Sequence, residues 1–401
     1  MTKIKIIAPS RLNGEITLPM SKSIASRVLI IRKLISLFSS QSGASSCSTP
    51  TLLKEFENEC EDIRILAQAL DKINTETSPQ PTILDIGNSG TAMRFLTAFL
   101  GIVNGTFILT GSERMKERPI APLVNAMSQL DTGTDYLEQS GFPPLIIKGG
   151  IPNTYKNELN IDATISSQFI SALLLIAPLL KNGLTLHLQG EIVSKPYIDL
   201  TIEIMRRFGT KVGWTDEKTI SISPSRYKDC NIEIESDWTA ASYWYEIMML
   251  QPDCNIKIKN LCHDSIQGDS IISKLMESLQ MRCSRPTNQP FTYNFRNNPD
   301  LVQTMAATCF GLDIPYHFTG IDSLRIKETD RIAALDNEFN KLRQGNYCIS
   351  TYNDHRMAMA FAPLALKLPY IIIENPEVVN KSYPTYWKDL ESVGFKCQRY
   401  E

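Results

Sequence analysis

Short runs of β-branched residues alternate with amphipathic helical stretches along this chain, and no other feature constrains its fold as much. Strands are predicted over residues 4–7, 15–18 and 83–86, with helices over residues 24–38 and 91–100. Such alternation is typical of α/β architectures. We therefore predict an α/β fold.

The length of 401 residues exceeds what one hydrophobic core usually serves, so two domains are expected. A strand predicted at residues 232–234 precedes a helix signal at residues 237–242, and a domain boundary is placed there. Residues 36–51 are rich in serine and predict a loop.

Composition narrows the class of protein. A formal net charge of −2 and a pI near 6.2 disfavour a surface for nucleic acid or anionic membranes. Nine cysteines without a C-x-x-C pair indicate reduced thiols and a cytoplasmic setting. Residues 1–9 lack the apolar region of a signal peptide, and the apolar stretch 169–180 is too short to span a bilayer. A soluble protein is expected.

Polar helix starts with nearby cations recur along the sequence. The first N–H groups of a helix lack internal partners, so such a start is a ready anion receptor. The starts are Ser21-Lys22-Ser23 with Arg27, Asn88-Ser89-Gly90-Thr91 with Arg94, Ser166-Ser167-Gln168, Ser194-Lys195-Pro196-Tyr197 and Asn353-Asp354-His355-Arg356. Each alone is more often an ordinary cap than a site. Their number is what predicts anion binding.

Lys327 and Arg331 stand four residues apart at the start of a helix predicted over residues 332–342. Like charges at this spacing repel, and cations near a helix N-terminus oppose its dipole. A bound anion would reverse both penalties. Glu328 and Asp330 offset part of the cost, so a solvated helix start is the structural alternative.

Further cations lie in the basic loop Arg114–Ile120 and at Lys381, where a surface position is the alternative reading. Arginine binds phosphate and carboxylate groups through its bidentate fork. At least five cations at helix starts or tight loops indicate an enzyme that handles small phosphorylated carboxylates, in a cleft between two lobes.

These motifs, in order over nearly the whole chain, resemble the family of 5-enolpyruvylshikimate-3-phosphate (EPSP) synthase, or 3-phosphoshikimate 1-carboxyvinyltransferase. The resemblance implies a two-lobed, inside-out α/β fold. Each lobe would comprise three βαβαββ units whose helix N-termini face the interlobe cleft. Residues 19–234 would form the first lobe, and residues 1–18 plus 235–401 the second.

The resemblance also implies the substrates and the residues that bind them. Phosphoenolpyruvate would contact Lys22, Gly90, Arg118, Gln168, Arg331, Arg356 and Lys381. Shikimate 3-phosphate would contact Lys22, Ser23, Arg27, Ser166, Ser167, Gln168, Ser194, Tyr197, Asp300, Ser323 and Lys327. Glyphosate, the family inhibitor, would compete with phosphoenolpyruvate beside Gly90.

By the same resemblance, Glu328 donates a proton to carbon, Asp300 is the base, and Lys22 assists addition and phosphate loss. Glu328 would have to carry a proton near neutral pH, which the charge of Lys327 opposes. No metal or other cofactor is expected, and the implied protein is a cytoplasmic monomer with only small-molecule partners.

The chain departs from the family pattern at several positions. Met20 stands in place of glycine, Phe95 in place of proline, and Ser323-Leu324 in place of an amide and an aromatic residue. The link over residues 343–351 is too short for the usual strand hairpin. A missing hairpin could expose a sheet edge and displace Arg356.

Two other functions stay open at this point. The related enolpyruvyl transferase for UDP-N-acetylglucosamine uses a loop cysteine, which Arg114–Ile120 lacks, and an asparagine where this chain has Ser23. A non-catalytic anion-binding relative would keep the receptor sites without turnover. Phosphate release from the two substrates would separate the enzyme from that relative.

Overall fold

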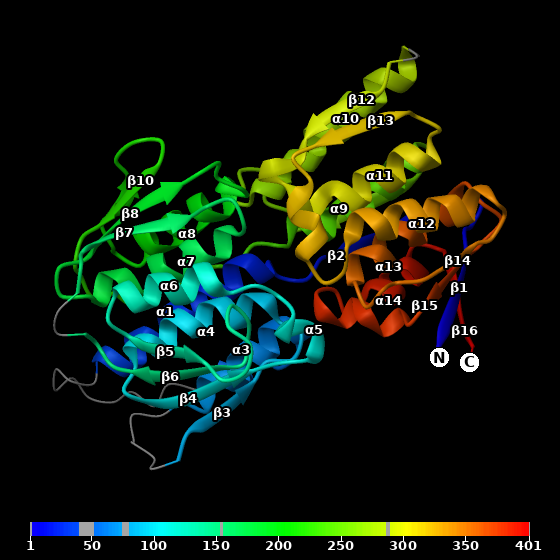
Figure 1. The fold of residues 1–401 in the computed structure, drawn as a ribbon. Helices are drawn as coiled ribbons and strands as arrows, with labels where there is room; N and C mark the ends of the chain where they lie inside the picture. Colours follow the sequence, from blue (N-terminus) through cyan, green and yellow to red (C-terminus); the bar gives the residue numbers. More distant parts are fainter. Residues whose placement is uncertain (1, 40–51, 74–79, 153–154, 286–288, 401) are drawn as a thin grey trace. The chain divides into compact units, whose positions relative to one another are not determined.

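A computed structural model describes residues 2–39, 52–73, 80–152, 155–285 and 289–400 (Figure 1). The chain forms two compact units. Unit 1 comprises residues 1–21 with 235–401, and unit 2 comprises residues 22–234. The sequence-based boundaries were placed at residues 19 and 235.

Two sheets of unit 2 share one strand order. The first has β3 (Thr82–Asp85), α4 (Gly90–Ile102), β4 (Gly105–Thr110), α5 (Glu113–Lys116), α6 (Ala121–Gln129), β5 (Gly133–Tyr136) and β6 (Leu145–Gly149). The second has β7 (Glu158–Asp162), α7 (Ser167–Ile176), β8 (Leu184–Gln189), α8 (Lys195–Arg207), β9 (Val212–Trp214) and β10 (Thr219–Ile222). The orders are β3-β4-β6-β5 and β7-β8-β10-β9, with the first pair parallel and the others antiparallel. Each is a βαβαββ unit, apart from the added short helix α5.

Helices α1 (Lys22–Ser39), α2 (Leu52–Phe56) and α3 (Glu61–Asp71) precede these sheets. The loop predicted at residues 36–51 is wrong for residues 36–39, because buried Leu34 and Leu37 carry the apolar face of α1 through them. Residues 40–51 lie outside the described residues. The strand predicted at residues 232–234 is also wrong, since no ladder partner lies beside it in the described part of the chain.

The largest sheet of unit 1 repeats the same pattern with strands from both ends of the chain (Figure 1). It contains β14 (Cys348–Ile349), α13 (His355–Phe361), β15 (Ile371–Glu374), α14 (Tyr386–Ser392) and β16 (Lys396–Tyr400), with β1 (Lys3–Ile7) between the last two strands. Here β1 pairs antiparallel with both β15 and β16. The N-terminal strand therefore completes the C-terminal βαβαββ unit.

The other two sheets of unit 1 have two strands each. Parallel β2 (Asn13–Thr17) and β11 (Asn255–Lys259) flank α9 (Trp238–Leu250), and parallel β12 (Phe291–Asn294) and β13 (Tyr316–Thr319) flank α11 (Val302–Gly311). Helix α10 (Ile272–Ser284) leads to β12, and α12 (Arg331–Arg343) leads to β14. The sequence predicted that one strand hairpin, the one after α12, is missing. In the described residues the hairpin after α10 is absent too.

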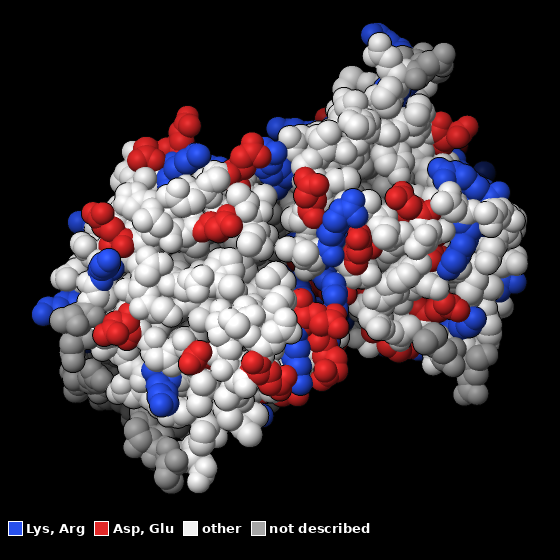
Figure 2. Space-filling view, in the orientation of Figure 1, with Lys and Arg blue, Asp and Glu red and all other residues white. Residues whose placement is uncertain are grey.

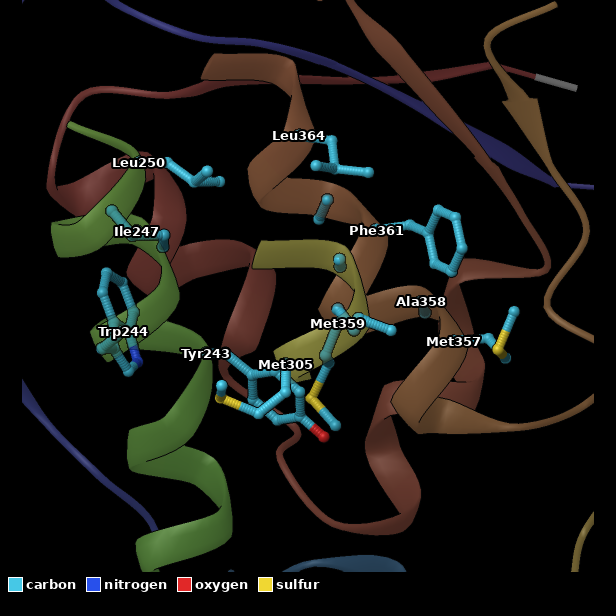
Figure 3. Packing of buried hydrophobic residues seen from close by; sticks show 14 of the residues in the cluster. Tyr243, Trp244, Ile247, Leu250, Met305, Met357, Ala358, Met359, Phe361 and Leu364 are labelled. Atoms are coloured by element: carbon cyan, nitrogen blue, oxygen red, sulfur yellow. The ribbon is translucent and has the colours of Figure 1, made fainter. Parts of the chain in front are cut away.

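Apolar side chains from α9, α11 and α13 form the core of unit 1 (Figure 3). Trp244 and Ile247 of α9 are fully buried, as are Met305 of α11 and Phe361 of α13. Glu246 of α9 is also fully buried, and neither carboxyl oxygen has a hydrogen-bond partner among the described residues. Burial raises the pKa of Glu246 well above its ordinary value.

Glu246→Gln is expected to increase stability at pH 8 but not at pH 5. The pKa of Glu246 is higher in the folded state than in the unfolded state. The protonated carboxyl therefore contributes fully to stability below the unfolded-state pKa, and this contribution is lost as pH rises through the folded-state pKa. The slope is about 1.4 kcal/mol per pH unit, and a neutral amide removes it. Thermal unfolding across pH measures the effect, with the exposed Glu277→Gln as control. A variant that is less stable at every pH would show that the carboxylate is ionised and paired.

Charges on the face drawn in Figure 2 are interspersed, without a large area of one sign. This distribution agrees with the small net charge of the sequence. Within the part of the chain that the structure describes, no helix has the length and apolar character needed to cross a membrane.

Candidate functional site

In unit 2, the N-termini of four helices lie close together. Gln168, the second residue of α7, donates from Nε2 to Thr91 Oγ1 at the start of α4 (3.0 Å). Arg27 donates to the carbonyl of Ser23 at the start of α1 (2.7 Å) and to that of Tyr197 at the start of α8 (3.1 Å). Unpaired N–H groups and helix dipoles therefore favour an anion here.

Arg27 ties three of these helices together. Its Nε donates to Thr201 Oγ1 of α8 (2.6 Å), and Nη2 donates to Ser171 Oγ of α7 (3.2 Å). Burial lowers the pKa of Arg27 to about 9, so it stays charged at neutral pH. Phe95, the departure from proline, lies with its ring 5.3 Å from this guanidinium. Of the five N–H donors of arginine, these bonds leave one on Nη1 for a ligand.

The predicted serines differ in what their hydroxyl groups do. Ser166 caps α7 by accepting the N–H of Gln168 (3.2 Å), which matches the structural alternative for this residue. Ser167 is buried within the first turn. Ser194 precedes α8 at φ 54°, a left-handed conformation that is unusual for serine, and its side chain makes no cap bond. Within the described residues, Ser194 is thus a buried serine whose hydroxyl does not cap its helix.

Arg118 is a buried cation packed against the start of α4. Its side chain is 8% exposed, and its Nε has no hydrogen-bond partner among the described residues. A Cβ at Gly90 would lie 2.6 Å from Arg118 Nη1. Gly90 therefore admits the guanidinium to the helix start, and a cation at a helix N-terminus favours an anion.

Lys22 forms an ion pair that the sequence did not reveal. Its Nζ lies 2.8 Å from Asp62 Oδ2 of α3, and Asp62 is only 5% exposed. Asp62 falls on the buried face of α3 with Ile63 and Leu66. A carboxylate on the apolar face of a helix was the available signal, since such a group requires a partner.

In unit 1, Asp300 is surrounded by predicted site cations. Its carboxylate lies 2.8 Å from Arg356 Nη2, 3.0 Å from Arg331 Nη1 and 4.0 Å from Lys327 Nζ. Burial alone would raise the pKa of Asp300, but Arg356, Lys327 and Arg331 hold it well below its ordinary value. Asp300 is therefore a carboxylate at every physiological pH.

Arg331 joins three carboxylates and is only 1% exposed. Besides Asp300, its Nη2 lies 2.9 Å from Glu328 Oε2 and its Nε 2.7 Å from Asp354 Oδ2. Burial would lower the pKa of Arg331, but these carboxylates raise it above its ordinary value. Lys381 Nζ lies 3.9 Å from Glu328 Oε1. One group thus unites the predicted acid, the predicted base and four cations.

The sequence interpretation of Lys327 was wrong in one respect. Helix α12 begins at Arg331 with Asp330 as its cap, so Lys327 lies before the helix and is not one turn from Arg331. The two cations nevertheless approach the same oxygen of Asp300. In this structure, the anion that both cations approach is the carboxylate of Asp300.

Two other predicted segments also differ from expectation. Part of the basic segment 114–120 is helical, because Ser112 caps α5 by accepting the N–H of Met115 (3.3 Å). Ser323 lies in the 3-10 helix Asp322–Ile326, and in the described part of the chain no hydrogen bond ties it to Asp300, Glu328 or Arg331. Its assignment as a substrate contact stays a prediction.

The two groups of residues suit different tasks. Helix starts with Arg27, Arg118 and Lys22 in unit 2 favour phosphate and carboxylate groups. The unit 1 group adds two carboxylates, which are able to act as a general acid and a general base, to further cations. The short link after α12 leaves Arg356 at contact distance from Asp300.

Comparisons with known proteins point to one family. The family model described as EPSP synthase (3-phosphoshikimate 1-carboxyvinyltransferase) matches residues 6–390. The 3-phosphoshikimate 1-carboxyvinyltransferase of Bacteroides fragilis (strain YCH46) is 41% identical over 419 residues, covering 97% of each chain. That of Colwellia psychrerythraea is 33% identical over 434 residues, covering 98% of this chain and 100% of the relative.

Solved structures also resemble this chain. The structure of EPSP synthase from Acinetobacter baumannii matches it with a TM-score of 0.72 and covers 100% of both chains. The sequence identity in that comparison is 17%, so the likeness shows a common fold.

Proposed function

Because this chain belongs to the EPSP synthase family, we propose that it transfers the enolpyruvyl group of phosphoenolpyruvate to the 5-hydroxyl of shikimate 3-phosphate. Phosphate is released, and the step belongs to chorismate and aromatic amino-acid biosynthesis. Family membership confirms the resemblance predicted from the motifs. The observation that carries the proposal is a family match over residues 6–390, within which the predicted acid, base and cations of unit 1 contact one another.

Residues of both units are assigned to the substrates. In unit 2, Ser23, Arg27, Ser166, Ser167, Ser194 and Tyr197 bind shikimate 3-phosphate, Gly90 and Arg118 bind phosphoenolpyruvate, and Lys22 and Gln168 contact both. In unit 1, Asp300, Ser323 and Lys327 bind shikimate 3-phosphate, and Arg331, Arg356 and Lys381 bind phosphoenolpyruvate. The helix starts and the buried Arg118 support this assignment.

The reaction proceeds by addition and elimination. Asp300 accepts the proton of the 5-hydroxyl as that oxygen bonds to carbon 2 of phosphoenolpyruvate. Glu328, a carboxylate paired with Arg331 in the free protein, takes up a proton before it delivers one to the methylene carbon. The adduct then loses a proton from the resulting methyl group to the Glu328 carboxylate, and its carbon–oxygen bond to phosphate breaks as phosphate leaves. Lys22 stabilises charge in both steps. Holding two substrates together supplies about 7 to 11 kcal/mol of the barrier reduction when their geometry is good.

The contacts of Asp300 support a way in which substrate binding increases its basicity. In the free protein, Asp300 accepts bonds from Arg356 and Arg331 and is a weak base. Phosphoenolpyruvate is an anion that competes for Arg356. Once a cation turns to the substrate, Asp300 becomes a stronger proton acceptor. Substrate binding thereby activates the base.

Phosphate release by the purified full-length chain tests this function. Release is expected only when phosphoenolpyruvate and shikimate 3-phosphate are both present, and replacing the latter with UDP-N-acetylglucosamine should abolish it. Binding of both substrates without phosphate release would instead support a non-catalytic anion-binding relative.

We further propose that the chain acts in the cytoplasm as a monomer, without a metal or other cofactor. The chemistry requires only proton transfer and charge stabilisation, which the side chains assigned above supply. A single monomeric species in light scattering, with activity unchanged by a chelator, is the expected result.

A further inference from the structure

Asp354 is a buried carboxylate whose two oxygens serve two different helices. Its exposure is 0%, and it caps α13. Oδ1 accepts the backbone N–H of Arg356 (2.9 Å) and, at a longer distance, Nη2 of Arg331 (3.5 Å), and Oδ2 accepts Nε of Arg331 (2.7 Å). One side chain therefore links the start of α13, which carries Arg356, with the guanidinium at the start of α12.

The two residues before Asp354 have unusual backbone conformations, which set the position of its side chain. Tyr352 and Asn353 both have left-handed conformations, with φ of 53° and 56°. Such conformations are uncommon in residues other than glycine, although asparagine tolerates them better than tyrosine, and they persist where surrounding contacts hold them. The Tyr352 hydroxyl donates to buried Glu338 (2.7 Å), and Asn353 Oδ1 accepts from Asn375 Nδ2 (2.9 Å). These contacts hold the turn that presents Asp354.

An amide cannot replace this carboxylate. Asparagine offers one acceptor oxygen and one donor nitrogen, so in either orientation a donor would face Arg356 N–H or Arg331 Nε–H. The cap of α12 is partly exposed, unlike Asp354. Oδ1 of Asp330 accepts both Ile332 N–H and Ala333 N–H, each at 3.1 Å, and Oδ2 lies 3.3 Å from Nη1 of exposed Arg325. Asparagine at position 330 keeps both cap bonds and loses only this surface pair, which contributes little.

We infer that Asp354 is a positioning residue for phosphoenolpyruvate, because it holds Arg331 and the helix start bearing Arg356 in a fixed relation. The inference rests on the proposed function, which assigns these two arginines to that substrate. Asp354, at 0% exposure, is assigned no contact with the reacting atoms. Its effect is to keep two cations oriented as a pair.

Full-length Asp354→Asn and Asp354→Ser test the inference, with Asp330→Asn as the matched control. Serine can still cap α13 but is too short to reach Arg331. Both Asp354 variants should raise KM for phosphoenolpyruvate about tenfold or more, while Kd for shikimate 3-phosphate stays within about threefold. Asp330→Asn should leave both constants within about twofold.

An unchanged KM for phosphoenolpyruvate in a folded Asp354 variant would overturn the inference, as would equal losses for the two substrates. A cooperative thermal unfolding transition shows that a variant is folded. If Asp354→Asn does not fold, the KM of Asp354→Ser for phosphoenolpyruvate tests the inference alone. Failure of the proposed function has a different signature, namely a wild-type chain that releases no phosphate. In that case, titration of phosphoenolpyruvate in the presence of shikimate 3-phosphate still compares the variants.

Discussion

Glu328→Gln is expected to lower kcat by about 10² to 10⁴, the range that general acid catalysis contributes. Glutamine retains an oxygen that can accept the bond from Arg331 Nη2, which is 2.9 Å long in the wild type, so substrate binding should change by less than about threefold. What it lacks is a transferable proton. Steady-state kinetics and titration of each substrate measure the two effects separately.

Glu377→Gln is the control for this prediction. Glu377 is a half-exposed glutamate that forms an ion pair with Arg399 at the surface of unit 1. Surface pairs contribute little to stability, so this variant should retain wild-type kinetics. A Glu328→Gln enzyme with near-normal turnover would refute the role of Glu328 as the acid.

Arg118→Ala is expected to weaken phosphoenolpyruvate binding by about 10²-fold or more while leaving shikimate 3-phosphate binding within about threefold. Charge-assisted hydrogen bonds contribute about 1.5 to 3 kcal/mol each, and a guanidinium can form two with one anion. Arg118 Nε has no partner among the described residues, so this donor is not committed to holding the fold. Any loss of stability should come from the missing packing of the buried side chain, and thermal unfolding measures it separately from binding.

Arg114→Ala is the matched control, because Arg114 lies in the same segment but is partly exposed and pairs with Glu117 at 2.9 Å. Arg114→Ala should change the binding of neither substrate. Equal losses of affinity for both substrates in Arg118→Ala would contradict the assignment of Arg118.

Arg356→Ala should also weaken phosphoenolpyruvate binding. It should destabilise the fold as well, since Asp300 would lose a partner at 2.8 Å.

The helices could be predicted from sequence because their signals are local. The apolar periodicity after Lys22, Gly90 and Ser167 gave α1, α4 and α7 to within a few residues. The cap residues Asp237 and Asp354 likewise marked the starts of α9 and α13. Caps and periodicity depend on residues within one or two turns, which a sequence displays directly.

Strand pairing could not be predicted in the same way. The placement of β1 between β15 and β16 joins residues from opposite ends of the chain, and no local pattern encodes it. Residues 232–234 have the composition of a strand, but a strand also requires a ladder partner. The short connection after α12 was visible from its length, whereas the one after α10 was missed.

The residue types of the candidate site were predictable, but their partners were not. Lys22 was identified from its helix start, yet its ion pair with Asp62 spans forty residues and depends on the packing of α3. Asp354 had the signature of a plain cap, because only the folded structure brings Arg331 to its second oxygen. Arg331 was expected to face substrate, and the structure surrounds it with three carboxylates.

Proton NMR of the reaction in deuterated water tests the central claim most directly. Enolpyruvyl transfer through carbon protonation predicts that vinyl signals of phosphoenolpyruvate give way to those of an ether at the 5-oxygen of shikimate 3-phosphate. One phosphate should form per ether, and deuterium should enter the vinyl methylene group. Phosphate formed without the ether, or an ether whose methylene group contains no deuterium, would contradict the account.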